Sequence, residues 1–512
     1  QQAASAECGA LPRLTGHQRS GLRACVAPEG SSTMPWWRPT RLPLVWLSLV
    51  GDLTGSLVAG NVYRYEDQVL EPNVIQYRRV GMWTARDAPV RGSPGKPGVS
   101  SVAIDLQLSR TRAERPGLVQ VLVFHSAYLS AVGTAGASGT SGAGGAASTY
   151  CCTPELHARG AAGCEHVGGI VVDPSRLGTG VFRHDLRFAA NQSVAAVRTK
   201  VAVARSGVHY LLLASCDLQT ERVLISGQTT WLNPYGYLPG ELYPFLPFFG
   251  GLSLAYVALG VLWLVLCLRH CAQLLPLQSC ISAVIFLGAV ESATWYFDYI
   301  SFNAGGTRGV APVVLGVLLS TVKKCVSRLL VLVVCLGYGV VRPTLGNVAY
   351  RVMALGLVYF VLAATLDVAS NVSKLSQLSV SSRLLLIIPM ALLDAFFYWW
   401  LFSGLARTLQ QLSSRRQSAK LLLYRRFSHV LLAAVVASTL WVGSQMAVIV
   451  SASLDARWNQ LWVFDAFWHV LYFMVLLAIC YLWSPSKNNR QYAYMDELGQ
   501  EADTHPEDEE LN

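Results

Sequence analysis

Charged residues are scarce in this sequence. Only 14% of its 512 residues are Asp, Glu, Lys or Arg, whereas 53% are apolar. An ordinary soluble protein carries about 25% charged residues. The mean hydropathy of +0.39 points the same way. This composition excludes a disordered chain, a coiled coil and a typical cytosolic enzyme.

The sequence also lacks the short motifs of common catalytic sites. It contains no phosphate-binding glycine loop, nucleophile elbow or zinc-protease helix. His429 and His469 have no third ligand nearby, which makes a poor zinc site. We therefore expect that the protein is not an enzyme and that it has neither catalytic residues nor a metal.

The first sixty residues have the layout of a leader. Residues 1–33 are rich in Ala, Gly, Ser and Arg and show no periodicity, so we interpret them as sequence upstream of the true start at Met34. Residues 34–60 then run from a basic start through the apolar stretch 42–50 to small residues, which is typical of a secretory signal peptide. An N-terminal anchor helix is the alternative, but an apolar core of about nine residues is too short to span a bilayer, which needs about 20.

Residues 61–230 have the pattern of an exported β-domain. Segment 102–108 alternates apolar and polar residues, and 118–124 and 208–214 are short β-rich runs, so all three are predicted strands. We therefore predict a β-sandwich. Within it, residues 130–149 are almost wholly small and are expected to form a flexible loop.

The four cysteines of this half are Cys151, Cys152, Cys164 and Cys216. With His157 and His166 nearby they could suggest zinc, but the spacing fits no common zinc pattern, and an exported domain favours disulfides. Neighbouring Cys151 and Cys152 cannot easily bond each other, so we expect Cys164 and Cys216 as partners, with the pairing open. The sequon at Asn191 predicts N-glycosylation.

The second half is predicted to cross the membrane seven times. Long uncharged runs follow one another between residues 245 and 483, with Trp and Tyr clustered at their ends. The predicted spans are 245–268, 277–299, 309–340, 352–369, 384–408, 428–450 and 463–483. The fold class is thus a multi-pass α-helical membrane protein, a seven-helix bundle, with an N-terminal lumenal β-sandwich.

Basic residues in the loops set the orientation. If the N-terminus is lumenal, ten Lys and Arg residues lie in cytosolic segments and four in lumenal ones, as the positive-inside rule requires. Residues 484–512 then form a cytosolic tail with eight carboxylates between Asp496 and Glu510. The net charge of +10 is therefore a signal of topology, and we expect no nucleic-acid partner.

Several charges remain near or within the predicted spans. Each costs about 2.5–3.5 kcal/mol at the bilayer centre on insertion scales. Acids on the second span and bases on the third can offset each other, since residues four or seven apart share a helix face. Two readings stay open: an ion-pair network that fixes helix packing, or a pathway for an ion or ligand. The candidate residues are Glu291, Asp298, Lys323, Lys324, Arg328, Asp394 and Asp465, with Asp367 a further charge.

The segment before the first span carries a specific motif. Residues 231–244 contain Asn-Pro-Tyr-Gly-Tyr-Leu-Pro-Gly-Glu-Leu-Tyr-Pro, which resembles the juxtamembrane motif of the lung-seven-transmembrane family, the GOLD-domain seven-helix (GOST) proteins. The likeness is closest to the branch called transmembrane protein 87 and covers about 231–495. Further matching segments are 283–288 with Glu291, 328–331 with 336–339 and Pro343, 465–468, and 483–495.

The resemblance implies a GOLD-like β-sandwich over 61–230 and residence in the Golgi membrane, with endosomes or the plasma membrane as further locations. It also implies a role in Golgi–endosome retrograde transport of membrane proteins; a cation channel sensitive to voltage, pH or force is proposed for the same branch. Glu291, Asp298, Lys323, Arg328 and Asp465 would then line the bundle interior. Phe464 and Val317 stand where acids are expected, which weakens the channel reading.

Three functions therefore compete. A trafficking protein would bind lumenal cargo and recruit a clathrin adaptor through Tyr492 and Met495, which fit a Tyr-x-x-apolar motif in the tail. A cation channel would use the intramembrane acids. A seven-helix receptor would couple through the basic loop 409–427. We expect membrane lipid to surround the helices. The one small-molecule ligand that we expect is a phospholipid bound among them.

Overall fold

The computed structural model describes most of the chain between residues 61 and 485. The predicted upstream segment, the signal peptide and nearly all of the tail, including Tyr492 and Met495, lie outside the described residues. The gaps within the described part are 73, 90–97, 111–115, 134–149, 177, 179, 218–221, 272–275, 339–345, 372–379, 416–417 and 451–454.

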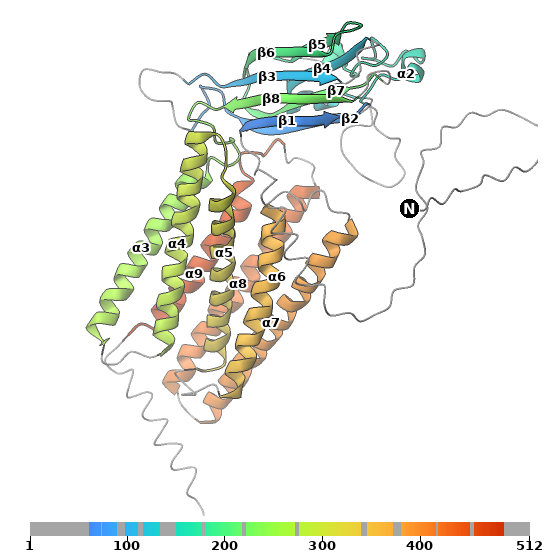
Figure 1. Cartoon of the computed structure of the whole chain (residues 1–512). Coiled ribbons are helices and arrows are strands. Elements are labelled where there is room, and N and C mark those ends of the chain that lie inside the picture. The colour runs from blue at the N-terminus through green and yellow to red at the C-terminus, as the bar shows by residue number, and fades with distance from the viewer. Residues whose placement is uncertain are drawn as a thin grey trace, which may run out of the picture. The chain divides into compact units, whose positions relative to one another are not determined.

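The N-terminal part is a sandwich of two antiparallel four-stranded sheets, as predicted (Figure 1). One sheet has the order β1-β8-β3-β6 and the other β2-β7-β4-β5. The strands predicted at 102–108, 118–124 and 208–214 are β3, β4 and β7. The bounds are β1 Val62–Leu70, β2 Val74–Met82, β3 Ser101–Arg110, β4 Gly117–His125, β5 Phe182–Phe188, β6 Val194–Ala202, β7 Gly207–Ser215 and β8 Val223–Leu232.

Alternation along the strands builds the core between the sheets. In β3, Val102, Ile104, Leu106 and Leu108 are buried, while Asp105 between them points outward to an ion pair with Arg198. Buried residues of the second sheet and Trp231 complete this core. Burial of one such apolar side chain stabilises the fold by about 1.5–3 kcal/mol, so this core is a main source of the stability of the sandwich.

The outer face of the second sheet is covered by the segment that follows β4. It holds the short helices η2 (Ser126–Ala131), α2 (Pro154–Ala158) and η3 (Pro174–Arg176). The predicted flexible loop 130–149 therefore starts too early: Ala131 is buried in η2, and Val132 is bridged to Val172. Its apolar residues pack on the sheet, which composition alone could not indicate; 134–149 lie outside the described residues.

Two disulfides hold this covering segment. Cys151 is bonded to Cys216 at the end of β7, and Cys152 is bonded to Cys164. The predicted partners are confirmed, and the pairing that the sequence left open is resolved. Among the described cysteines, those of the sandwich are all bonded, and the free ones all belong to the helical part.

His209 of β7 gives the sandwich a pH dependence. Its ring is buried, Nδ1 lies 3.1 Å from the Gly207 carbonyl oxygen, and burial lowers its pKa to about 4, with His125 adding to the shift. The unfolded chain takes up this proton near pH 6.5, so stability falls as the pH drops from about 6.5 towards 4, by about 2 kcal/mol at pH 5.

Thermal unfolding of the full chain should show this loss of stability at low pH, and His209→Gln should remove it. Exposed His184→Gln is the matched control; an unchanged pH profile in His209→Gln would contradict the assignment.

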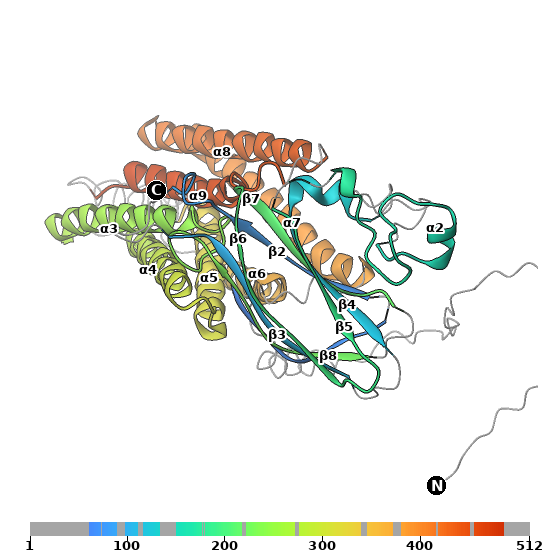
Figure 2. The ribbon, with the colours of Figure 1, turned by 90° about the horizontal axis from the view of Figure 1, so that it is seen from above.

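The C-terminal part consists of long helices packed side by side (Figures 1 and 2). Helix α5 packs against α4, α6 and α7, and α9 packs between α3 and α8. The bounds are α3 Phe245–Arg269, α4 Pro276–Gly305, α5 Val310–Cys335, α6 Asn347–Asn371, α7 Val380–Ser414, α8 Ser418–Val450 and α9 Trp462–Leu482.

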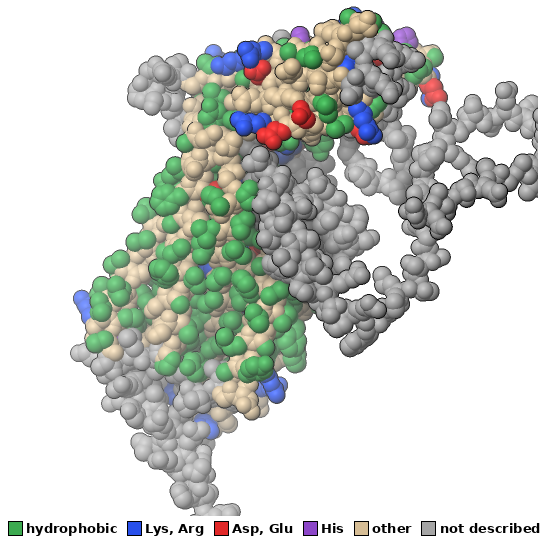
Figure 3. Space-filling model, viewed as in Figure 1, with side chains coloured by type: hydrophobic (Ala, Val, Ile, Leu, Met, Phe, Trp, Pro, Cys, Tyr) green, Lys and Arg blue, Asp and Glu red, His purple; other side chains and the backbone are tan. Residues whose placement is uncertain are grey.

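Six of these helices are long and apolar enough to cross a membrane. The remaining one, α5, has 26 residues but carries Lys323, Lys324 and Arg328, so the seven predicted spans correspond to α3 to α9. Figure 3 shows apolar side chains over the visible helices and charged ones gathered on the sandwich.

Helix ends differ from the apolar runs. Helix α8 begins at Ser418, ten residues before its predicted span, because this first part is held by the buried rings of Tyr424 and Phe427. Helix α5 ends at Cys335, before the predicted end at 340, because Gly337 turns the chain with a φ of +84°. Hydropathy marks the part of a helix within the bilayer, whereas packing fixes where the helix begins and ends.

Candidate functional site

Six of the intramembrane charges form a cluster around α5, with three bases on α5 and one acid on each of three neighbouring helices. Its three bases point to three different helices, because successive residues of a helix are rotated by about 100°. Lys323 faces α4, Lys324 faces α6 and Arg328 faces α7. The cluster therefore joins four helices through one central element.

Glu291 and Lys323 are the most deeply buried pair. Glu291 has no exposed surface, and its Oε2 lies 2.6 Å from Nζ of Lys323. The Ser320 hydroxyl donates to Oε1 at 2.7 Å, and Nδ1 of His469 lies 3.9 Å from the same oxygen. Ser320 in turn accepts a hydrogen bond from Nε1 of Trp295 at 3.0 Å. The carboxylate thus has partners on two sides, which a charge needs in a low-dielectric interior.

The other two bases of α5 are also paired. Nζ of Lys324 lies 3.0 Å from Oδ2 of Asp367, which also accepts from the Thr321 hydroxyl at 3.1 Å. Arg328 forms an ion pair with Asp394, and its guanidinium lies 4.6 Å above the ring centre of Tyr359. A cation above an aromatic face is stabilised further by the ring quadrupole.

Asp298 is paired differently from the prediction. It lies buried in α4 but is bonded to Arg308, at 2.8 Å from Nε, and not to the bases of α5. Arg308 precedes α5 in the chain, and its guanidinium lies 5.5 Å from the Trp295 ring centre and 5.2 Å from that of Tyr299. Two turns along α4 separate Asp298 from Glu291, so the two acids meet different partners at different depths.

Asp465 is exposed in the first turn of α9, and among the described residues no ion pair of the cluster includes it. It still lies close enough to Lys324 of α5 for the two charges to interact, and it shares a face of α9 with Trp468 and Tyr472, which line the cavity described below. Unbonded backbone N–H groups at a helix N-terminus favour a carboxylate there. Nearby, Phe464 contacts Trp441, and Val317 is buried in α5, so these positions add no charge to the interior.

The sequence patterns do not identify three residues that contact the buried acids. Arg308 enters only the count of basic residues in the loops, His469 is considered only as a zinc ligand, and Ser320 belongs to no pattern. Ser320 stands three residues before Lys323, a spacing that places both on one helix face and could have revealed it. The contacts of Arg308 and His469 depend on how helices pack, which the sequence does not indicate.

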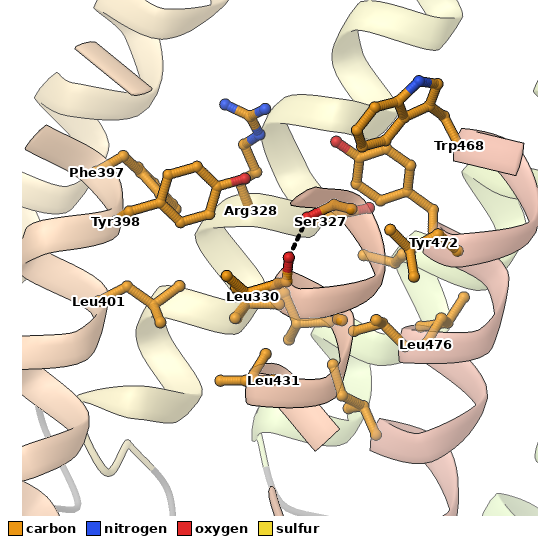
Figure 4. A pocket seen from close by; sticks show the side chains of 18 of the residues that line it. Ser327, Arg328, Leu330, Phe397, Tyr398, Leu401, Leu431, Trp468, Tyr472 and Leu476 are labelled. Carbon is orange, nitrogen blue, oxygen red and sulfur yellow. Dashed lines mark hydrogen bonds between the residues drawn. The ribbon is translucent and has the colours of Figure 1, made fainter. Parts of the chain in front are cut away.

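A cavity of about 150 Å³ opens beside this cluster (Figure 4). Figure 4 shows Ser327, Arg328 and Tyr398 at one end and Leu401, Leu431 and Leu476 towards the other. Lys323 also lines the cavity, and most of the remaining lining is aliphatic or aromatic. Figure 4 also shows Trp468 and Tyr472 of α9 lying next to each other at its rim. The lining is therefore apolar with a polar end, the arrangement that suits an amphiphile.

The cluster is suited to holding helices together. Its three ion pairs, and the separate pair of Asp298 and Arg308, each join an acid to a base, so these charges cancel locally. Within the described residues, no three His, Cys, Asp or Glu side chains come together in a way that could hold a metal. The remaining predicted site, Asn191, is exposed in the turn between β5 and β6 with a φ of +72°.

Comparison with known proteins agrees with this architecture. Residues 244–490 match the family model described as GOST, seven transmembrane domain. These residues are a GOST seven-transmembrane domain. The resemblance read from the juxtamembrane motif is thereby confirmed, and the GOST domain contains all four intramembrane ion pairs.

Curated relatives cover the same part of the chain. Mouse transmembrane protein 87B is 35% identical over 292 residues, 57% of this chain and 52% of the relative. Human transmembrane protein 87A is 36% identical over 265 residues, 51% and 46% respectively. The yeast membrane protein PTM1 is 30% identical over 289 residues, 54% and 53%. The chain thus spans about half the length of the curated relatives it matches.

Proposed function

We propose that this multi-pass membrane protein acts in membrane-protein trafficking, in Golgi–endosome retrograde transport, and that it does not conduct ions. The observation that carries the choice is the pairing of the buried charges. A cation path needs acids that are free to exchange partners, whereas Glu291 and Asp298 are held by Lys323 and Arg308. The sandwich is then the part that binds lumenal cargo, and the tail recruits a clathrin adaptor.

The cysteines support a lumenal sandwich and a cytosolic tail. The four bonded cysteines belong to the sandwich, as in an oxidising compartment. Cys271 and Cys280, which are free and exposed, flank the far ends of α3 and α4. Attachment of a glycan at Asn191, seen as a mass shift on treatment with a glycosidase, tests this orientation.

The tail motif allows the trafficking role to be tested in cells. Tyr492→Ala in the full chain should shift its steady-state location from the Golgi towards endosomes or the plasma membrane, because adaptor binding needs the tyrosine ring. Tyr494→Ala, two residues away, is the matched control and should leave the location unchanged. Equal distributions of the Tyr492→Ala variant and the wild type would remove the tail from the proposal.

Binding of a phospholipid is the second candidate function, and the cavity beside Arg328 favours it. The guanidinium end suits a phosphate, and the leucine-lined part suits an acyl chain. Ala434→Trp fills the cavity from α8, so it should reduce co-purified phospholipid several-fold as measured by mass spectrometry. Ala433→Trp, on the exposed side of the same helix, should not. Equal lipid content in the two variants would contradict this site.

A further inference from the structure

The segment between α8 and α9 is bound to the sandwich through a tryptophan. Trp458 is buried, and its ring lies 4.7 Å from that of Trp83. Two glycines flank the ring: a Cβ on Gly81 would lie 2.8 Å from its Cε3, and a Cβ on Gly240 would lie 2.6 Å from its Cζ3. The N–H of Gly240 donates to the Gly81 carbonyl at 2.7 Å. Two bare backbone segments thus form a slot that only a pair of glycines leaves open.

Polar contacts hold the same segment beside the slot. Arg79 of β2 donates to Asp455 at 2.9 Å and to Glu241 of the juxtamembrane motif at 3.2 Å. The Tyr210 hydroxyl donates to the other oxygen of Asp455 at 2.8 Å. Burial raises the pKa of Glu241, and the Arg79 guanidinium opposes this shift. Arg79 therefore joins three separate stretches of the chain at one point.

The tryptophan stands directly before α9. That helix begins at Trp462, four residues after Trp458. The Trp462 ring lies 5.9 Å from that of Phe248 in α3, which in turn lies 6.2 Å from the ring of His469. His469 also packs against Phe249 at 5.1 Å. A series of packed rings therefore leads from Trp462, the first residue of α9, to His469 beside Glu291, and the short stretch of chain between Trp458 and Trp462 joins this series to the sandwich.

We propose that the slot formed by Gly81 and Gly240 is a latch through which the β-sandwich fixes the first two turns of α9, and with them His469 beside the Glu291–Lys323 pair. The stretch from Trp462 to His469 is about 10 Å of helix, short enough to move as a rigid rod. Trp458 and the glycines are positioning residues. This role goes beyond trafficking, since it requires neither cargo nor adaptor.

Hydrogen exchange of the purified full chain tests the latch. Trp458→Ala should speed amide exchange in residues 462–469 by about tenfold or more, while β3, β8 and α5 keep their wild-type rates. Trp399→Ala removes a tryptophan that is 62% exposed on α7 and is the matched control. Unchanged exchange in 462–469, or an equal rise in β3 and β8, would overturn the proposal.

A second variant pushes the ring out without removing it. Gly81→Ala introduces the clashing Cβ at a residue whose φ is not in the left-handed region, so the strand itself can keep its conformation. It should reproduce the faster exchange in 462–469. Gly251→Ala, where an added Cβ meets nothing within 4 Å, should not. Wild-type exchange in Gly81→Ala would show that the slot does not hold Trp458.

Discussion

Glu291→Gln is expected to destabilise the folded protein by about 3–5 kcal/mol, because it leaves Lys323 charged and unpaired inside the bundle. Lys323→Met should cost a similar amount by leaving the carboxylate with only Ser320 and His469. The double variant removes both charges and should recover much of either loss. Equilibrium unfolding of the purified full chain, analysed as a double-mutant cycle, measures the coupling between the two residues.

The exposed pair of Arg198 and Asp105 is the matched control. Its side chains are 83% and 49% exposed, and they lie 2.9 Å apart, so breaking it should cost less than about 1 kcal/mol. If the buried pair holds α4 and α5 together, the coupling energy of Glu291 and Lys323 is several times larger than that of the control pair. Additive effects at the buried pair would mean that the two charges do not depend on each other.

Removal of the Cys151–Cys216 disulfide is expected to lower stability by about 4.3 kcal/mol, and removal of Cys152–Cys164 by about 2.8 kcal/mol. The two bonds span 65 and 12 residues, and the entropy that a crosslink removes from the unfolded chain grows with the loop that it closes. Paired Cys→Ala variants should therefore differ by about 1.5 kcal/mol in thermal or denaturant unfolding.

Cys271→Ala serves as the control for these variants, since its thiol is free and exposed. It should leave stability unchanged. Equal losses for the two disulfides would show that native contacts around the bonds, and not loop closure, decide their contribution.

The fold was predictable because its patterns are local. Alternation in 102–108 and apolar runs such as 245–268 follow directly from the periods of strand and helix. The end of α5 and the start of α8 could not be predicted in this way. The first depends on the turn at Gly337, and the second depends on the packing of the Tyr424 and Phe427 rings. Residues 130–133 were expected to begin a flexible loop, and this prediction was wrong for the same reason, because contacts with residues distant in the sequence order them.

The candidate site was predictable as a set of residues but not as pairs. The free-energy cost of a charge inside the bilayer is enough to indicate that Glu291, Lys323 and Arg328 need partners of opposite charge. The partner of each charge depends on which helices pack together, which the sequence does not indicate. For this reason the pairing of Asp298 with Arg308, and not with a base of α5, could not be predicted. The resemblance places Asp465 in the interior; its side chain is exposed in the first turn of α9 but close enough to Lys324 of α5 for the two charges to interact.

Ion flux tests the central claim, that the buried charges hold helices together and do not form a path. The purified full chain would be reconstituted into liposomes and K⁺ efflux followed under an imposed potential. We expect efflux equal to that of empty liposomes for both the wild type and Glu291→Gln. Efflux above that of empty liposomes, altered by Glu291→Gln, would contradict it.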